Sequence, residues 1–176
     1  MNQLQFYKPN PKSTGSACSF WKNQEEKNNE TVHTFWCSLI KQHSWNSKTR
    51  TGSFSENKDN PEKRVIIKFS ATEICGLIDA IERNVPYEGY HGSNQVVKFY
   101  FKPYFPKKKD KENKWVASKE QGGFSLSVQK EDKEDSTNKQ SYVIGFTWPE
   151  SKLLCYYLET IVKQSFLSKG KNKSKE

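Results

Sequence analysis

The chain has 176 residues and carries 29 basic against 20 acidic side chains, which leaves a net charge of +9. This length can bury a core without disulfide or metal staples, so one domain, or two small halves sharing a core, is expected. Aromatic residues make up 14% of the chain and all hydrophobic residues 33%. Rings beside a surplus of lysine favour a nucleic acid as the partner, ahead of an anionic membrane surface.

The four cysteines, Cys18, Cys37, Cys75 and Cys155, are widely spaced, with no C-x-x-C pair and no histidine at metal-ligand spacing. No apolar run reaches the length of a membrane span, and the first residues do not resemble a signal peptide. We therefore expect a soluble intracellular protein, in the cytoplasm or nucleoid, or in the host cell if viral. Its thiols should be reduced, and it should have no membrane partner, metal or cofactor.

Strand patterns occupy residues 16–21, 31–42 and 64–69, with a shorter one at 49–54. The segment 31–42 is apolar on both faces, and such a strand is usually covered on both. Trp36 is therefore expected in the core or at a subunit interface.

The first helix is predicted to begin at Ser70, where Ser70 and Glu73 form a capping box. An apolar stripe with helical spacing follows, and Asn84 and Pro86 then provide a stop signal. The stripe consists of Ile74, Leu77, Ile78, Ile81 and Val85.

The second half has strand patterns at 95–104, 123–130 and 141–147, and another is possible near Trp115. A second capping box, Thr147 with Glu150, opens the second helix. Pro149 lies in its first turn, where proline is tolerated.

The two helical units resemble each other, because residues 66–73 align with 143–150 and the register continues into both helices. This indicates an internal duplication and an α+β fold with antiparallel sheets. We predict an N-terminal extension at 1–14, one domain at 15–167 built from halves 15–90 and 91–167, and a disordered lysine-rich tail at 168–176.

The strand at 95–104 carries the clearest binding pattern. Alternation places Val97, Phe99 and Phe101 on one face and Lys98, Tyr100 and Lys102 on the other. The second face combines cations with a ring, which suits backbone neutralisation and base stacking. An ordinary solvated face with one exposed tyrosine remains the alternative.

A second cluster lies in the polar, glycine-bearing stretch after residue 41. Aromatic and basic side chains alternate there without an obvious core to hold them, which favours base stacking and phosphate pairing, although Trp45 could instead plug the end of the sheet. With candidates from neighbouring strands, the predicted set is completed by Trp21, Lys41, Trp45, Lys48, Arg50, Phe54 and Lys68.

Sequence signatures of enzymes are missing. The chain has no Walker loop, no G-x-G-x-x-G and no G-x-S-x-G, and its three histidines lack metal-ligand spacing. We predict a protein that is not an enzyme, although a site assembled from distant residues stays open.

The repeated strand-[ST]-x-x-E-helix units, from Phe69-Ser70 to Glu82 and from Phe146-Thr147 to Glu159, together with the basic and aromatic composition, resemble the Whirly-like superfamily of single-stranded nucleic-acid binders. Its members include the plant Whirly proteins, mitochondrial guide-RNA-binding proteins and the half-sized transcriptional positive cofactor four. The likeness covers residues 15–167. The Lys-Gly-Lys-Ala-Ala-Leu motif of plant Whirly proteins is missing, so no binding residue is transferred.

The resemblance implies two antiparallel sheets packed crosswise, helices that support a homo-oligomer (dimer or tetramer), and nucleic acid along the sheet edges. The expected function is largely sequence-independent binding of single-stranded DNA in replication, recombination, repair or transcription. Two alternatives remain open: a guide- or messenger-RNA chaperone, and a protein-interaction subunit that binds no nucleic acid.

Overall fold

The computed structural model describes residues 3–27, 30–92, 95–110, 112–133 and 139–167. The predicted tail at 168–176 lies outside the described residues.

The first half of the chain forms a four-stranded antiparallel sheet followed by a helix. The strand order is β1-β2-β3-β6, so β1 and β6 are the edges. A small hairpin and a single 3-10 turn, Ser55–Asn57, lie between β3 and β6. The elements are β1 (Leu4–Lys8), β2 (Ser16–Lys27), β3 (Glu30–Lys41), β4 (Ser44–Asn46), β5 (Thr51–Ser53), β6 (Arg64–Phe69) and α1 (Ala71–Arg83).

The second half repeats this plan. Its sheet has the order β12-β11-β8-β7, with a two-stranded ribbon, β9 and β10, inserted after β8. The elements are β7 (Tyr87–Gly92), β8 (Gln95–Tyr104), β9 (Lys107–Lys109), β10 (Trp115–Ala117), β11 (Gly123–Asp132), β12 (Lys139–Thr147) and α2 (Trp148–Leu167).

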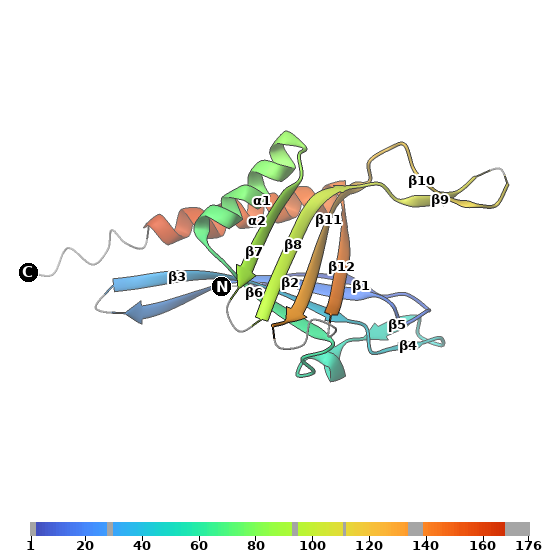
Figure 1. Ribbon diagram of the computed structural model, residues 1–176, viewed down its shortest axis with the longest axis horizontal. Coiled ribbons are helices and arrows are strands. Elements are labelled where there is room, and N and C mark those ends of the chain that lie inside the picture. The colour runs from blue at the N-terminus through green and yellow to red at the C-terminus, as the bar shows by residue number, and fades with distance from the viewer. Residues whose placement is uncertain (1–2, 28–29, 93–94, 111, 134–138, 168–176) are drawn as a thin grey trace, which may run out of the picture.

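The two sheets lie face to face with their strands crossing at a large angle, and the helices lie side by side at one end (Figure 1). The inner faces of both sheets form one core, and each large apolar side chain buried there contributes about 1.5–3 kcal/mol. Core residues include Phe20, Leu39, Phe69, Phe101, Phe124 and Phe146. The predicted α+β fold of two antiparallel sheets and two helices is confirmed.

Strand pairing shows how far the internal repeat extends. One row of paired residues crosses the first sheet, and a matching row crosses the second: Leu4, Phe20, Cys37 and Ile67 correspond to Tyr87, Phe101, Leu126 and Ile144. Counting along the strands from these rows, Lys8 corresponds to His91 and Ile66 to Val143. The duplication therefore includes all four strands of each sheet and not only the strand-helix units seen in the sequence.

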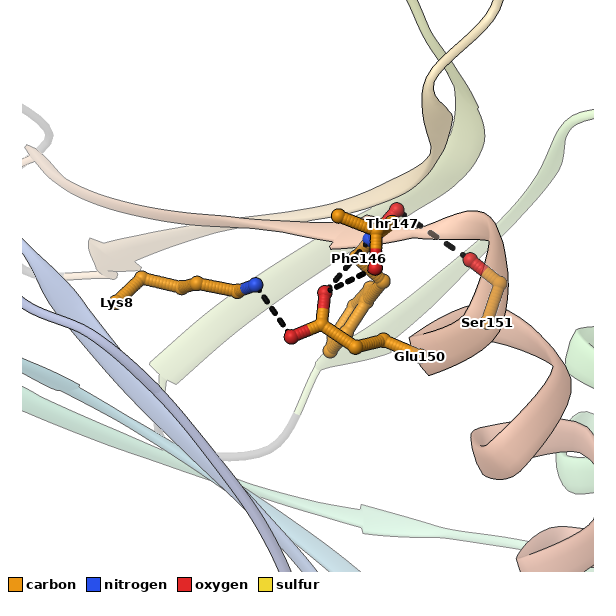
Figure 2. A network of polar contacts seen from close by, with 5 residues as sticks. All are labelled: Lys8, Phe146, Thr147, Glu150 and Ser151. Carbon is orange, nitrogen blue, oxygen red and sulfur yellow. Dashed lines mark hydrogen bonds and ion pairs between the residues drawn. The ribbon is translucent and has the colours of Figure 1, made fainter.

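The capping box of Ser70 and Glu73 forms as predicted, Thr147 donates to Glu150 at the start of α2, and each glutamate also contacts the other half. Glu73 Oε2 accepts from the Ser70 backbone N–H at 2.8 Å, while its Oε1 lies 3.1 Å from His91 Nε2 in β7. Glu150 Oε2 accepts from the Thr147 N–H at 2.7 Å, and its Oε1 forms an ion pair with Lys8 in β1 (Figure 2). The start of each helix thus lies against the first strand of the other half, and for α2 an ion pair holds it there.

The first turn of α2 has a further contact with the strand that precedes it. Ser151 is fully buried, and its hydroxyl donates to the Phe146 carbonyl oxygen at 3.4 Å (Figure 2).

Two predicted boundaries differ from the strand pairing. The segment 1–14, expected to be an extension, contains β1, which pairs with β2 and belongs to the first sheet. The expected boundary between residues 90 and 91 falls inside β7, which pairs with β8 along its whole length. Asn84, with φ +55°, ends α1 in a left-handed conformation, and the second half begins just after it.

Candidate nucleic-acid interface

A groove follows the free edge of β6. It consists of two adjoining hollows of about 410 and 520 Å³, which share Ile66, Gln95 and Val97 as lining residues. One wall is therefore the edge strand of the first sheet, and the other is the beginning of β8 in the second sheet. We call this the β6-edge groove.

Basic side chains line both ends of the β6-edge groove. Lys58, Arg64 and Lys130 lie at one end, and Lys68 and His91 at the other. Among the described lining residues of both hollows, Asp59 is the single carboxylate. The groove therefore carries a surplus of positive charge.

Arg64 is held in place by its neighbours. Its Nε donates to Ser38 Oγ at 3.0 Å, and its Nη1 donates to the Lys58 carbonyl oxygen at 2.8 Å. Lys130 reaches across from the second sheet and donates to the Pro61 carbonyl oxygen at 3.2 Å. These hydrogen bonds fix part of the cationic wall before any ligand binds, which lowers the entropy cost of binding.

Two tryptophans form a platform beside the groove. Trp21 and Trp36 are directly paired across β2 and β3, and their rings stack with centroids 6.3 Å apart. Lys68 is paired with Trp36 on the other side, with its Nζ 5.5 Å from the centroid of the Trp36 ring system. The structure thus brings two predicted binding residues, Trp21 and Lys68, together on either side of Trp36.

Of the two places expected for Trp36, the core is wrong, and a subunit interface stays a prediction. The inward positions of β3 are taken by Phe35, Cys37 and Leu39, so alternation turns Trp36 to the outer face, where it is half-buried and lines the groove. Trp36 makes the outer face of β3 more apolar. From the sequence pattern alone, such a face cannot be distinguished from a second buried face.

The outer face of the second sheet carries the predicted residues of β8. Lys98 and Lys102 are exposed and Tyr100 is half-buried, while Phe99 and Phe101 are buried. The predicted alternation is therefore confirmed. Because the sheets pack through their inner faces, this surface lies on the opposite side of the molecule from the tryptophan platform.

The hairpin β4–β5 holds three further predicted residues. Trp45 is half-buried and paired with Gly52, whereas Lys48 and Arg50 are exposed in the turn. Phe54 is a correction: it is only 7% exposed, with its ring centroid 5.8 Å from that of Tyr7. Packing against β1 leaves it no free face for a base.

Lys41, the remaining predicted residue, is half-buried at the end of β3, away from the β6-edge groove. Its Nζ lies 4.7 Å from the centroid of the Tyr142 ring, beside the edge strand β12.

The basic ribbon β9–β10 was not predicted from the sequence, apart from the possible strand near Trp115, and it protrudes from the body of the protein (Figure 1). Lys107, Lys108 and Lys109 are all exposed, and Trp115 is 67% exposed. Lys109 Nζ lies 5.8 Å from the Trp115 ring centroid. The run Lys107–Lys109, followed closely by Trp115, was the sequence signal that could have identified this surface.

One described cluster has metal-ligating atoms close together. Glu82, Cys155 and Glu159 place one such atom each within 4.8 Å of the others. Burial, Glu159 and Glu82 raise the pKa of Cys155 to about 11, so its thiol is protonated at neutral pH.

Neither helix of the described chain is both long and apolar enough to cross a membrane.

Comparison with solved structures identifies the fold. The plant transcriptional regulator PBF-2 superposes with a TM-score of 0.65 at 11% identity, covering 100% of this chain and 97% of that one. WHY3 from Arabidopsis thaliana gives 0.63 at 12% identity, covering 100% and 98%. MRP1/MRP2 from Trypanosoma brucei gives 0.53 at 13% identity, covering 93% and 85%.

The chain therefore has a Whirly-like fold, as predicted from the repeated strand-helix units. No protein-family model and no curated protein matches the sequence.

Proposed function

We propose that this protein binds single-stranded DNA, largely without sequence preference, and that the strand lies in the β6-edge groove. The observation that carries the proposal is a pair of adjoining hollows whose lining includes Trp36, one ring of the stacked pair, and the hydrogen-bonded side chains of Arg64 and Lys130. Arg64, Lys68 and Lys130 would neutralise phosphates, while Trp36, supported by Trp21, would stack a base.

Stacking on a side chain requires an exposed base face, which a single strand offers and a duplex largely hides. Each stacked base contributes about 1–3 kcal/mol, and every base has such a face, so binding of this kind tolerates many sequences. The geometry therefore supports a single strand of any sequence better than a duplex.

The remaining predicted residues stay in the proposal as secondary contacts. Lys98, Tyr100 and Lys102 on the second sheet and Trp45, Lys48 and Arg50 on the hairpin could hold the strand beyond the groove. RNA is the alternative ligand, because an electrostatic and stacking surface does not by itself distinguish the sugar.

We also propose a homo-oligomer, a dimer or tetramer, formed through the helices. Exposed apolar side chains on α2 support this, since such patches on a soluble surface often mark interaction sites. They are Leu153, Tyr156, Phe166 and Leu167. The protein would act inside the cell on single strands in replication, recombination, repair or transcription, without catalysing a reaction.

The test is a titration of fluorescently labelled single-stranded DNA, matching RNA and matching duplex, followed by anisotropy at several salt concentrations. We expect the single-stranded DNA to bind more tightly than the duplex, with an affinity that falls as salt rises. Equal, weak binding of all three would contradict the proposal and direct attention to protein partners.

A further inference from the structure

The free edge of the second sheet, β12, also borders a hollow. This hollow has a volume of about 530 Å³ and lies between β12, the end of β3 and the turn at 13–16. Its lining includes Lys41, Lys63, Ser16 and Tyr142. We call it the β12-edge hollow.

The internal repeat makes this hollow the counterpart of the Arg64 end of the β6-edge groove. In the groove, Arg64 and Ile66 of β6 lie beside the Val97–Lys130 pair of β8 and β11. Counting along the matching rows, the equivalent elements are Ser141 and Val143 of β12 and the Ser16–Lys41 pair of β2 and β3. The fold thus builds the same type of edge cavity twice.

The two cavities use different cations. Ser141 of the β12-edge hollow occupies the position that Arg64 has in the groove. The positive charges of the hollow come from Lys41 and from Lys63, which lies in the loop before β6. Lys41 and Lys63 are fixed close together, because the Lys41 N–H donates to the Lys63 carbonyl oxygen at 2.9 Å. Asn57 Nδ2 also donates to the Lys41 carbonyl oxygen at 2.9 Å.

The two ammonium groups repel each other. Burial and the charge of Lys63 lower the pKa of Lys41, and none of the residues lining the hollow in the described chain is a carboxylate. Nearby, burial and Glu62 raise the pKa of Tyr142 to about 12, so its phenol is neutral and adds no negative charge. An anion in the hollow would relieve the repulsion between the lysines.

The rim of the hollow is rigid. Gln42, only 5% exposed, accepts at Oε1 from the N–H groups of Asn10 (2.9 Å) and Gly15 (3.1 Å). A Cβ on Gly15 would lie 2.3 Å from the Lys8 carbonyl oxygen, so the close approach of the turn requires glycine there. The serines of this turn are thereby held beside the two lysines.

We infer that the β12-edge hollow binds a phosphate group of single-stranded nucleic acid, as a second binding site separate from the β6-edge groove. This inference rests on the proposed function and deepens it. Lys41 and Lys63 neutralise the phosphate, and the hydroxyl groups of the turn donate hydrogen bonds to its oxygens. The phosphate belongs either to the strand in the groove or to a second strand.

The test compares Lys41→Gln/Lys63→Gln with Lys119→Gln/Lys152→Gln, a control that removes the same charge from exposed positions outside both cavities. Labelled single-stranded DNA is titrated at several salt concentrations. If one phosphate is no longer neutralised, the slope of log K against log salt should fall by about 0.7, beyond the change in the control. Lys63→Gln alone, at an exposed position, provides a second variant should the double variant be unstable.

Counting bound short strands identifies the source of the phosphate. If the wild-type chain binds two strands and the double variant binds one, the phosphate belongs to a second strand. If both bind one strand per chain and the double variant has the reduced slope, the phosphate belongs to the strand in the groove. Slopes and strand counts equal to those of the control would overturn the inference.

A second readout keeps the inference separate from the proposed function. Should wild-type protein bind no strand, thermal unfolding in inorganic phosphate, against chloride at equal ionic strength, still tests the hollow. A rise in the midpoint for wild type and the control, and none for Lys41→Gln/Lys63→Gln, supports a phosphate site while the proposed function fails. Equal rises in all three overturn the phosphate site as well.

Discussion

Trp21 and Trp36 stack across neighbouring strands with an angle of 12° between their ring planes, on the outer face of the first sheet. Trp36 also lines the β6-edge groove, so the stacked pair extends from the sheet surface into the cavity. Trp21 supports one side of the Trp36 ring, and Lys68 Nζ lies 5.5 Å from its centroid on the other side, so a base placed on Trp36 requires the Lys68 side chain to move aside toward a phosphate. The support from Trp21 reduces the entropy cost of ordering the ring on binding.

Replacing Trp36 with alanine should weaken binding of single-stranded DNA by about 1–3 kcal/mol, the contribution of one stacked base. The effect should be similar at all salt concentrations, because stacking involves no counterion release. Anisotropy titrations measure it, and Phe105→Ala, which removes an exposed ring outside both cavities and outside the α2 patch, is the control. An affinity equal to that of the control would remove Trp36 from the interface.

The secondary contacts can be tested in the same way. Lys98→Ala should flatten the salt dependence of binding, by about 0.7 in the log–log slope for each phosphate that Lys98 neutralises. Trp45→Ala should weaken binding at every salt concentration. If both variants bind as wild type does, the strand does not extend beyond the groove onto these surfaces.

The ribbon β9–β10 offers a separate stacking position at Trp115. Since this ring is largely exposed, Trp115→Ala should leave the unfolding midpoint unchanged while reducing the affinity for long single strands more than for short ones. Titrations with two strand lengths measure this difference. Equal reductions for both lengths would place Trp115 within the primary site instead of on an additional arm.

Glu150 should stabilise the fold in a pH-dependent manner. Burial opposes its ionisation, but the bonds from Lys8 and Thr147 outweigh it and lower its pKa. Its stabilising effect is therefore complete above the ordinary pKa of glutamate, about 4.3, and disappears as the pH falls through the lower folded value.

The corresponding variant is Glu150→Ala, which removes the acceptor of the Thr147 N–H at the start of α2 and the link to Lys8. It should lower the free energy of unfolding by about 1–2 kcal/mol at pH 7. Urea titrations at neutral and acidic pH measure the difference from wild type, which should shrink at low pH. A difference that stays constant across this range would show that the charge of Glu150 is unimportant.

The two helices and the repeat that relates them could be predicted, because the residues that indicate them lie close together in the sequence. Ser70 with Glu73 and Thr147 with Glu150 define the helix starts within a few residues, and the aligned strand residues before them indicate the repeat. The β1 strand escaped prediction because Leu4–Lys8 is short and lies at the edge of its sheet, beside β2.

The site was less accessible to sequence reasoning. Arg64, Ile66 and Lys130 meet only because two sheets cross, so no spacing along the chain brings them together. For single residues, the sequence pattern did not show which face is buried: Phe54, predicted to bind, is buried, whereas Trp36, predicted in the core or at a subunit interface, lies half-buried on the outer face of the first sheet.

The central claim is that a single strand occupies the β6-edge groove. The most direct measurement is the salt dependence of single-stranded DNA binding for Arg64→Gln/Lys130→Gln beside the control Lys119→Gln/Lys152→Gln, with unfolding midpoints confirming that both are folded. If the strand lies in the groove, the groove variant alone should bind more weakly, with a slope reduced by about 0.7 for each phosphate left without its cation. Equal affinities and slopes in the two variants would contradict it.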